Sequence, residues 1–117
     1  MLKKINRLKK RYQFSYVYKY GEHVSGNYIV LYFTGSKTKN IKVGLAVTKK
    51  VGKAVVRNKI RRRLREVIKN QLQNLKQHYN IIVVAKDNIT NAKFDELANE
   101  FNKLTKKAEL IKNEESI

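Results

Sequence analysis

Residues 41–67 read IKVGLAVTKKVGKAVVRNKIRRRLREV, and the spacing of their apolar residues changes halfway along. Over 41–48 apolar residues alternate with small or polar ones, which is typical of a half-buried strand. Further on, Val56, Ile60, Leu64 and Val67 recur at intervals of four, four and three, the period of an amphipathic helix. Nine of the 17 residues from 49 to 65 are Lys or Arg, and none is acidic. We therefore predict a strand followed by a folded helix that carries concentrated positive charge.

The segments before this stretch predict a helix and a second strand. Residues 10–20 place Phe14, Val17 and Tyr18 on one helix face, and a glycine stops the helix at position 21. YIVLYF (28–33) is β-branched and aromatic, as strands are. We expect this strand and 41–48 to pair as an antiparallel hairpin across the turn cluster GSKTKN (35–40).

The segments after this stretch complete the order α-β-β-α-β-α. The basic helix is expected to run from about residue 54 to 75, and the apolar run IIVVA (81–85) predicts a central strand. A last helix is expected to be capped by Thr90 or Asn91. Its predicted buried face consists of Phe94, Leu97, Ala98, Phe101, Leu104, Ala108 and Ile111. The pattern predicts an α+β fold with one sheet packed by helices.

The charge of the chain is concentrated in its first half. The 117 residues fit a single domain, 1–117, in which we expect 1–9 to be a flexible basic segment. Residues 1–65 hold 19 Lys and Arg against one acid, whereas 66–117 hold eight of each sign, so the first part carries the whole net charge of +18. Such a charge favours nucleic acid as a partner, with an anionic membrane second.

The composition also restricts the chemistry and the location. The chain has no cysteine, which excludes disulfides and Cys-based zinc sites and is compatible with the cytoplasm, where we expect the protein. The start, MLKKINRLKK, is basic but is not followed by the apolar run of an export signal. Carboxylates show no metal-ligand spacing. His23 and His78 leave open a protein nuclease, although neither lies beside a distinctive motif.

The basic helix has the wrong charge for its position. Cations near a helix N-terminus cost a few tenths to about 1 kcal/mol each at low salt, and here nine lie at or near that end. A phosphate backbone would offset this cost. Five of the six cations within the helix are Arg, which favours bidentate phosphate contacts, and Arg57, Arg61 and Arg65 share one face. The alternative is a solvated charged face.

Aromatic residues form a second candidate feature. Phe14 and Tyr18 on the first helix, with Tyr28 and Tyr32 on the first strand, would suit a groove for unstacked bases. The alternative interpretation is that these rings are part of the core.

The stretch GLAVTKKVGKAVVRNKIRRRLRE (44–66) resembles the signature of the bacterial ribonuclease P protein component. The matching positions are Gly44, Val47, Thr48, Lys49, Lys50, Gly52, Ala54, Val55, Arg57, Asn58, Lys59, Arg61, Arg62, Arg65 and Glu66. Arg7-Leu8, Phe14 with Tyr18, Gly21, NYIVLY (27–32) and IIVVA follow in family order. At position 59 this chain has Lys where the family usually has Arg. The positive charge is kept, but the planar guanidinium that can make a bidentate contact is lost.

The resemblance implies the protein subunit of an RNA enzyme with a ribosomal protein S5 domain 2-like fold. It implies a left-handed βαβ crossover from 41–48 to 81–85, whereas such units are usually right-handed. In that family the RNA subunit, with bound Mg²⁺, removes the 5′ leader of precursor tRNA, so no catalytic residue and no membrane or small-molecule partner is expected here. The resemblance places Phe14, Tyr18, Val30 and Tyr32 in a leader cleft. The RNA-facing residues that it implies are Lys49, Lys50, Lys53, Arg57, Asn58, Lys59, Arg61, Arg62 and Arg65.

Two other functions remain open. A structural RNA-binding protein of the ribosomal type would share the charge and the fold but would need no leader cleft. A self-sufficient protein nuclease would use one of the two histidines.

Overall fold

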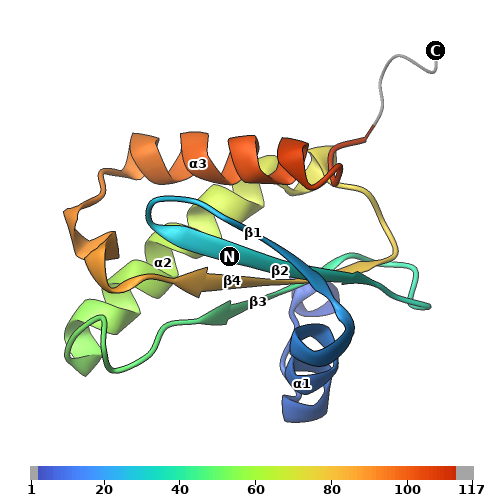
Figure 1. Cartoon of the computed structure of the whole chain (residues 1–117), viewed down its shortest axis with the longest axis horizontal. Helices are drawn as coiled ribbons and strands as arrows, with labels where there is room; N and C mark the ends of the chain where they lie inside the picture. The colour runs from blue at the N-terminus through green and yellow to red at the C-terminus, as the bar shows by residue number, and fades with distance from the viewer. Residues whose placement is uncertain (1–2, 113–117) are drawn as a thin grey trace.

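Strand β4 (Tyr79–Ala85) lies inside the sheet, with one strand paired to it antiparallel and another paired to it parallel. The structure is a computed structural model that describes residues 3–112. Its sheet has the order β1-β2-β4-β3 (Figure 1). The other strands and the helices are β1 (Glu22–Ser25), β2 (Ile29–Gly35), β3 (Lys42–Ala46), α1 (Arg11–Tyr20), α2 (Ala54–Gln71) and α3 (Phe94–Lys107). Short 3-10 helices cover Lys4–Asn6, Leu72–Asn74 and Asp87–Asn91.

The predicted hairpin between 28–33 and 41–48 is wrong. β2 pairs antiparallel with β4, β3 pairs parallel with β4, and β2 and β3 are not neighbours in the sheet. The physical reason lies in β4, whose side chains are apolar on both faces and whose position between two strands buries Ile81, Ile82 and Val83 completely. The βαβ crossover that the resemblance implies is therefore β3–α2–β4.

Strand β1 was not predicted from the sequence. It reads EHVS, pairs antiparallel with β2 along one edge of the sheet, and is mostly exposed. An exposed edge strand needs no apolar alternation, so its pattern is that of a loop.

The helices cover the two faces of the sheet unequally. α2 and α3 pack on one face, over the main core formed with Leu31, Val43 and Val83. α1 lies on the opposite face, where Val17, Leu8 and Ile82 form a smaller apolar cluster. Figure 1 shows α3 above the strands and α1 below them. No helix over residues 3–112 is long and apolar enough to cross a membrane.

The apolar stripe of α2 is confirmed over most of its length. Ile60, Leu64, Val67 and Ile68 are buried, as the period of the sequence predicts. Val56 is an exception with 36% of its surface exposed, because the first turn of α2 extends past the sheet. The helix ends at Gln71, earlier than predicted, and a 3-10 turn carries the chain on to the buried Leu75.

The N-terminus of α3 differs from the prediction. Residues 87–91 form a 3-10 helix, so neither Thr90 nor Asn91 caps α3. The cap position is Lys93, whose backbone N–H donates to the carboxylate of Glu96 at 2.9 Å. The predicted buried face is confirmed at its centre, where Leu97, Phe101 and Leu104 are buried, but Phe94 is 37% exposed.

The segment before α1 packs against the sheet, in contrast to the flexible segment predicted for 1–9. The Leu8 N–H donates to the carbonyl oxygen of Val43 at 3.1 Å, and the Asn6 side-chain amide donates to that of Ile41 at 2.8 Å. Leu8 is buried in the cluster under α1. Ordering this segment costs conformational entropy. The burial of Leu8 and the pairing of the segment with the free edge of β3 offset that cost. Residues 1 and 2 lie outside the described residues.

Candidate nucleic-acid interface

The N-terminus of α2 is exposed and strongly basic. Gly52 precedes the helix and has a φ of +156°, a backbone conformation that residues other than glycine rarely adopt. Lys53 at the cap position makes no side-chain capping bond, and the first turn contains no acid. The first backbone N–H groups of α2 therefore remain available to an anion.

Arg61 is held in place by its neighbours. Its guanidinium donates to the Asn58 side-chain oxygen at 2.9 Å and to the carbonyl oxygen of Val47 at 3.4 Å. These two bonds fix the direction of Arg61 and tie α2 to the segment that follows β3. Asn58 is thus a positioning residue for Arg61, which a reading of the sequence as a simple basic helix does not reveal.

Arg57 carries a buried donor that has no partner. Its Nε atom is buried and makes no hydrogen bond with any described residue. A buried polar group without a partner costs free energy, and in native proteins it often marks a functional position. An anion bound at α2 would give this guanidinium a hydrogen-bond acceptor.

A groove of about 330 Å³ joins α2 to the opposite face of the sheet. Phe14 of α1 and both Arg61 and Arg65 of α2 line it, so the structure brings together residues predicted for the leader cleft and for the RNA-facing helix. Its remaining lining residues are Arg7, Leu8, Lys9, Val43, Gly44 and Leu45. Arg7 and Lys9 were missed as site residues because the first nine residues were expected to be flexible. The signal for them was the basic composition of that segment.

Phe14 lies directly over Gly44 of β3. A Cβ atom on Gly44 would come within 2.4 Å of the Phe14 ring, which is closer than real Cβ atoms approach their neighbours. The glycine at this position therefore lets the Phe14 ring approach the backbone of the strand closely, beside the groove.

The other predicted cleft residues form an aromatic corner between α1 and the sheet. The rings of Tyr18 and Tyr32 meet edge to face, with centroids 4.9 Å apart. Burial, and secondarily the charge of Tyr32, raises the pKa of Tyr18 above its ordinary value of 10.0. His23 of β1 lies against the other side of Tyr32 at 5.3 Å between ring centroids. Tyr28, in contrast, packs against the main core and is not part of this corner.

Val30 extends the apolar surface of the sheet beyond α1. It pairs with Val84 of β4, which in turn pairs with Ala46 of β3, so the three side chains form a row on the face that α1 occupies. All three are half-buried. α1 covers the adjacent row at Ile82 and leaves this one accessible, which creates a shallow apolar floor beside the aromatic corner.

The predicted RNA-facing cations fall on two sides of α2. Arg57, Arg61 and Arg65 are half-buried, and Arg61 and Arg65 line the groove. Lys59 and Arg62 lie on the opposite side, next to Phe94 of α3. The exposed Lys49, Lys50 and Lys53 surround the start of the helix. Only part of the predicted set therefore lines the groove.

The two histidines do not form a joint site in the structure. His23 stacks on Tyr32 at the edge strand β1, and His78 is a turn residue with φ of +66° whose ring nitrogen lies 3.1 Å from the carbonyl oxygen of Thr38. Over 3–112 no group of three His, Cys, Asp or Glu side chains is suitably placed to hold a metal ion.

Comparisons with known proteins show the family of the chain and agree with its fold. A sequence profile of the family described as Ribonuclease P matches residues 2–109. The ribonuclease P protein component of Caldanaerobacter subterraneus is 36% identical over 115 residues, which are 98% of this chain and 99% of that protein. The solved structure of the Staphylococcus aureus RNase P protein superposes with a TM-score of 0.84 at 30% identity, covering 92% of this chain and 98% of that one. The RNase P protein from Thermotoga maritima gives a TM-score of 0.77 at 25% identity, with 86% and 96% covered.

Proposed function

Because the chain belongs to the ribonuclease P protein family, and is therefore a protein component of that tRNA-processing endoribonuclease, we propose that it works by binding RNA on two adjoining surfaces. The first surface is the N-terminal half of α2, which binds the ribonuclease P RNA. The second is the cleft under α1, which binds the single-stranded 5′ leader of precursor tRNA. The groove that contains both Phe14 and Arg61 carries this proposal, since it joins the two surfaces.

The chemistry of α2 supports its assignment to the catalytic RNA. Its accessible N–H groups, the helix dipole and a run of cations all favour phosphate. The guanidinium of Arg61, which Asn58 holds in place, suits a bidentate contact, and the half-buried Arg57 lies one turn away on the same side of the helix. The remaining contacts that we propose come from Lys49, Lys50, Lys53, Asn58, Lys59, Arg62 and Arg65.

The chemistry of the cleft supports its assignment to a single strand. Bases that are unpaired can stack on aromatic rings, and Phe14, Tyr18 and Tyr32 are presented around the apolar floor at Val30. A mature tRNA lacks the leader and cannot use these contacts. The cleft thereby favours the precursor over the product.

We propose that the hydrolytic step takes place on the RNA subunit, with Mg²⁺ held mainly there. Nine Lys or Arg side chains between residues 49 and 65 would repel a divalent cation and attract the phosphates that accompany it, which supports a metal site on the RNA. The contribution of this chain is to bind and orient both RNAs, in the cytoplasm where tRNA precursors are processed.

The α2 assignment is tested by the salt dependence of RNA binding. Arg57→Ala with Arg61→Ala should weaken binding to the ribonuclease P RNA and should flatten the slope of log K against log salt by roughly 0.7–0.9 for each lost phosphate contact. Lys103→Ala, which removes an exposed cation from α3, is the matched control and should leave the slope unchanged. An unchanged slope in the arginine variant would place these arginines away from the RNA.

The cleft assignment is tested with substrates that do or do not carry a leader. In the reconstituted holoenzyme, Phe14→Ala should weaken binding of precursor tRNA by about 1–3 kcal/mol and should leave mature tRNA binding unchanged. Equal weakening of both, or none, would favour the alternative of a structural RNA-binding protein. Thermal unfolding of the variant, measured in parallel, separates lost stacking from lost stability.

A further inference from the structure

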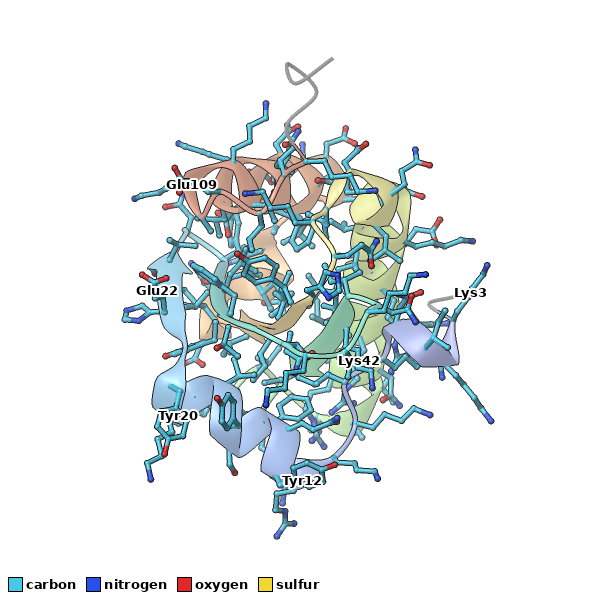
Figure 2. All side chains as sticks on the ribbon, turned by 90° about the vertical axis from the view of Figure 1, so that its right-hand side faces the viewer. Lys3, Tyr12, Tyr20, Glu22, Lys42 and Glu109 are labelled. Carbon is cyan, nitrogen blue, oxygen red and sulfur yellow. The ribbon has the colours of Figure 1, made fainter. Side chains whose placement is uncertain are left out.

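Three tyrosines lie along the side of α1 that faces away from the sheet. Tyr12, Tyr16 and Tyr20 are 67%, 53% and 61% exposed and are four residues apart, so they share one face of the helix. We call them the α1 tyrosine stripe. Figure 2 shows Tyr12 and Tyr20 at the foot of the molecule, directed away from the strands. The cleft residues Phe14 and Tyr18 belong to the sheet side of the same helix.

The stripe contributes little to the stability of the fold. Val17 is the buried residue of α1, and none of the three tyrosines belongs to either apolar cluster of the structure. Single exposed aromatics are common, but three on one helix face, two of them in ring contact, form an apolar surface of the kind that usually marks a binding site.

The surroundings of the stripe favour a polyanion with flat apolar groups. Lys10 lies with its ammonium 5.8 Å from the ring centre of Tyr12, and Lys19 lies 5.3 Å from that of Tyr20. α1 contains no acidic residue. An apolar protein surface would match the rings but not the cations, whereas a single-stranded nucleic acid offers bases for the rings and phosphates for the lysines.

The stripe is long enough for a short run of stacked bases. The rings of Tyr16 and Tyr20 are already close, with centroids 4.8 Å apart and planes inclined by 46°. At 1.5 Å per residue, the stripe extends over about 12 Å from Tyr12 to Tyr20. This length exceeds three stacking separations of about 3.4 Å, so a short run of bases fits along it.

We propose that the α1 tyrosine stripe binds the upstream part of the 5′ leader, after the strand has left the cleft on the other side of the same helix. This inference rests on the proposed function of the cleft. It extends the bound strand from the sheet side of α1, at Phe14 and Tyr18, to its outer side. Longer leaders then bind more tightly than leaders that only fill the cleft.

The test uses the reconstituted holoenzyme and precursor tRNAs whose leaders lengthen by one nucleotide at a time. The variant Tyr12→Ala/Tyr16→Ala/Tyr20→Ala should bind short leaders as the wild type does and should bind long leaders at least about fivefold more weakly. The matched control replaces the same three residues with Phe, which keeps the rings and should retain the wild-type dependence on leader length. Since all three side chains are exposed, both variants should fold, which circular dichroism checks.

The outcomes separate this inference from the proposed cleft. Unchanged affinity at every leader length would overturn the role of the stripe, while Phe14→Ala would still report on the cleft. Equal weakening at every length, mature tRNA included, would assign the stripe to another partner and would also overturn the inference. Weakening of long leaders by the stripe variant, without any effect of Phe14→Ala, would instead refute the cleft.

Discussion

Replacement of Gly44 by alanine should displace Phe14 from the groove. The new Cβ would lie 2.4 Å from Cζ and 3.0 Å from Cε2 of the Phe14 ring, and 3.2 Å from Cβ of Leu8. The ring is the end of a side chain and can rotate, whereas Gly44 lies in β3, which is paired to the central strand. We therefore expect the ring to swing outward and β3 to stay in place.

The size of the effect follows from these contacts. Overpacking of this kind costs about 1–3 kcal/mol of stability. In a Phe14→Ala background the two shortest contacts no longer exist, and replacement of a strand glycine gains about 0.5–1 kcal/mol. Gly44→Ala should therefore cost about 1–3 kcal/mol beside Phe14 and nearly nothing without it. The coupling energy between the two positions is expected to be about 1–3 kcal/mol.

Urea unfolding of the wild type, the two single variants and the double variant measures this coupling. If the costs of the single changes add to within about 0.5 kcal/mol in the double variant, Gly44 does not seat the ring and the reasoning is refuted. A second measurement concerns function. Gly44→Ala should lower discrimination between precursor and mature tRNA as Phe14→Ala does, although the glycine itself has no side chain to contact RNA.

Three further changes have definite expected results. Glu100 accepts the backbone N–H groups of residues 27–29 at 2.8–2.9 Å, so Glu100→Ala should lower the free energy of unfolding in urea by about 2–4 kcal/mol, against less than about 1 kcal/mol for exposed Asp95→Ala on the same helix. The pKa of Tyr18 is raised in the folded protein, so the stability that its protonated hydroxyl contributes is complete below pH 10 and is lost as the pH rises through the folded pKa. Tyr18→Phe should abolish this loss of stability at alkaline pH. Identical curves of unfolding free energy against pH for the wild type and the variant would contradict this expectation. A Cβ at Gly21 would lie within 2.6 Å of two backbone carbonyl oxygens that cannot rotate away, so Gly21→Ala should lower the melting temperature more than Gly44→Ala does.

The sequence predicts those elements whose burial shows in their own pattern. The pattern of the sequence indicates the stripe of α2 at Ile60, Leu64 and Val67 and the apolar run of β4, because both elements pack against the core over most of their length. The sequence does not indicate β1, because three of its four residues are exposed and its strand geometry depends on pairing with β2. The β-propensity of a segment predicts its structure poorly when pairing with neighbouring strands decides whether it is a strand.

The pairing of the strands and the assembly of the site depend on contacts between distant residues. The residues of 28–33 and 41–48 do not indicate that a third strand lies between these two strands in the sheet. The groove is a similar case, since Phe14, Gly44 and Arg61 come from three elements that only the fold brings together. The sequence motif contains the cations of α2. The hydrogen bond from Arg61 to Asn58, and the close contact of Phe14 with Gly44, are visible only in the three-dimensional structure.

The position of β4 between β2 and β3 also has a consequence for folding kinetics. β3 has no strand partner until β4 arrives, and Ala46 and Tyr79 are 33 positions apart in the chain. Closing this loop costs entropy before any pairing compensates for it, and such long-range contacts slow folding. α2 lies within this loop, so its cations take up their positions beside β3 only when the sheet is complete. Core variants of β4 should therefore weaken RNA binding by depleting the folded population, without altering any residue that faces RNA.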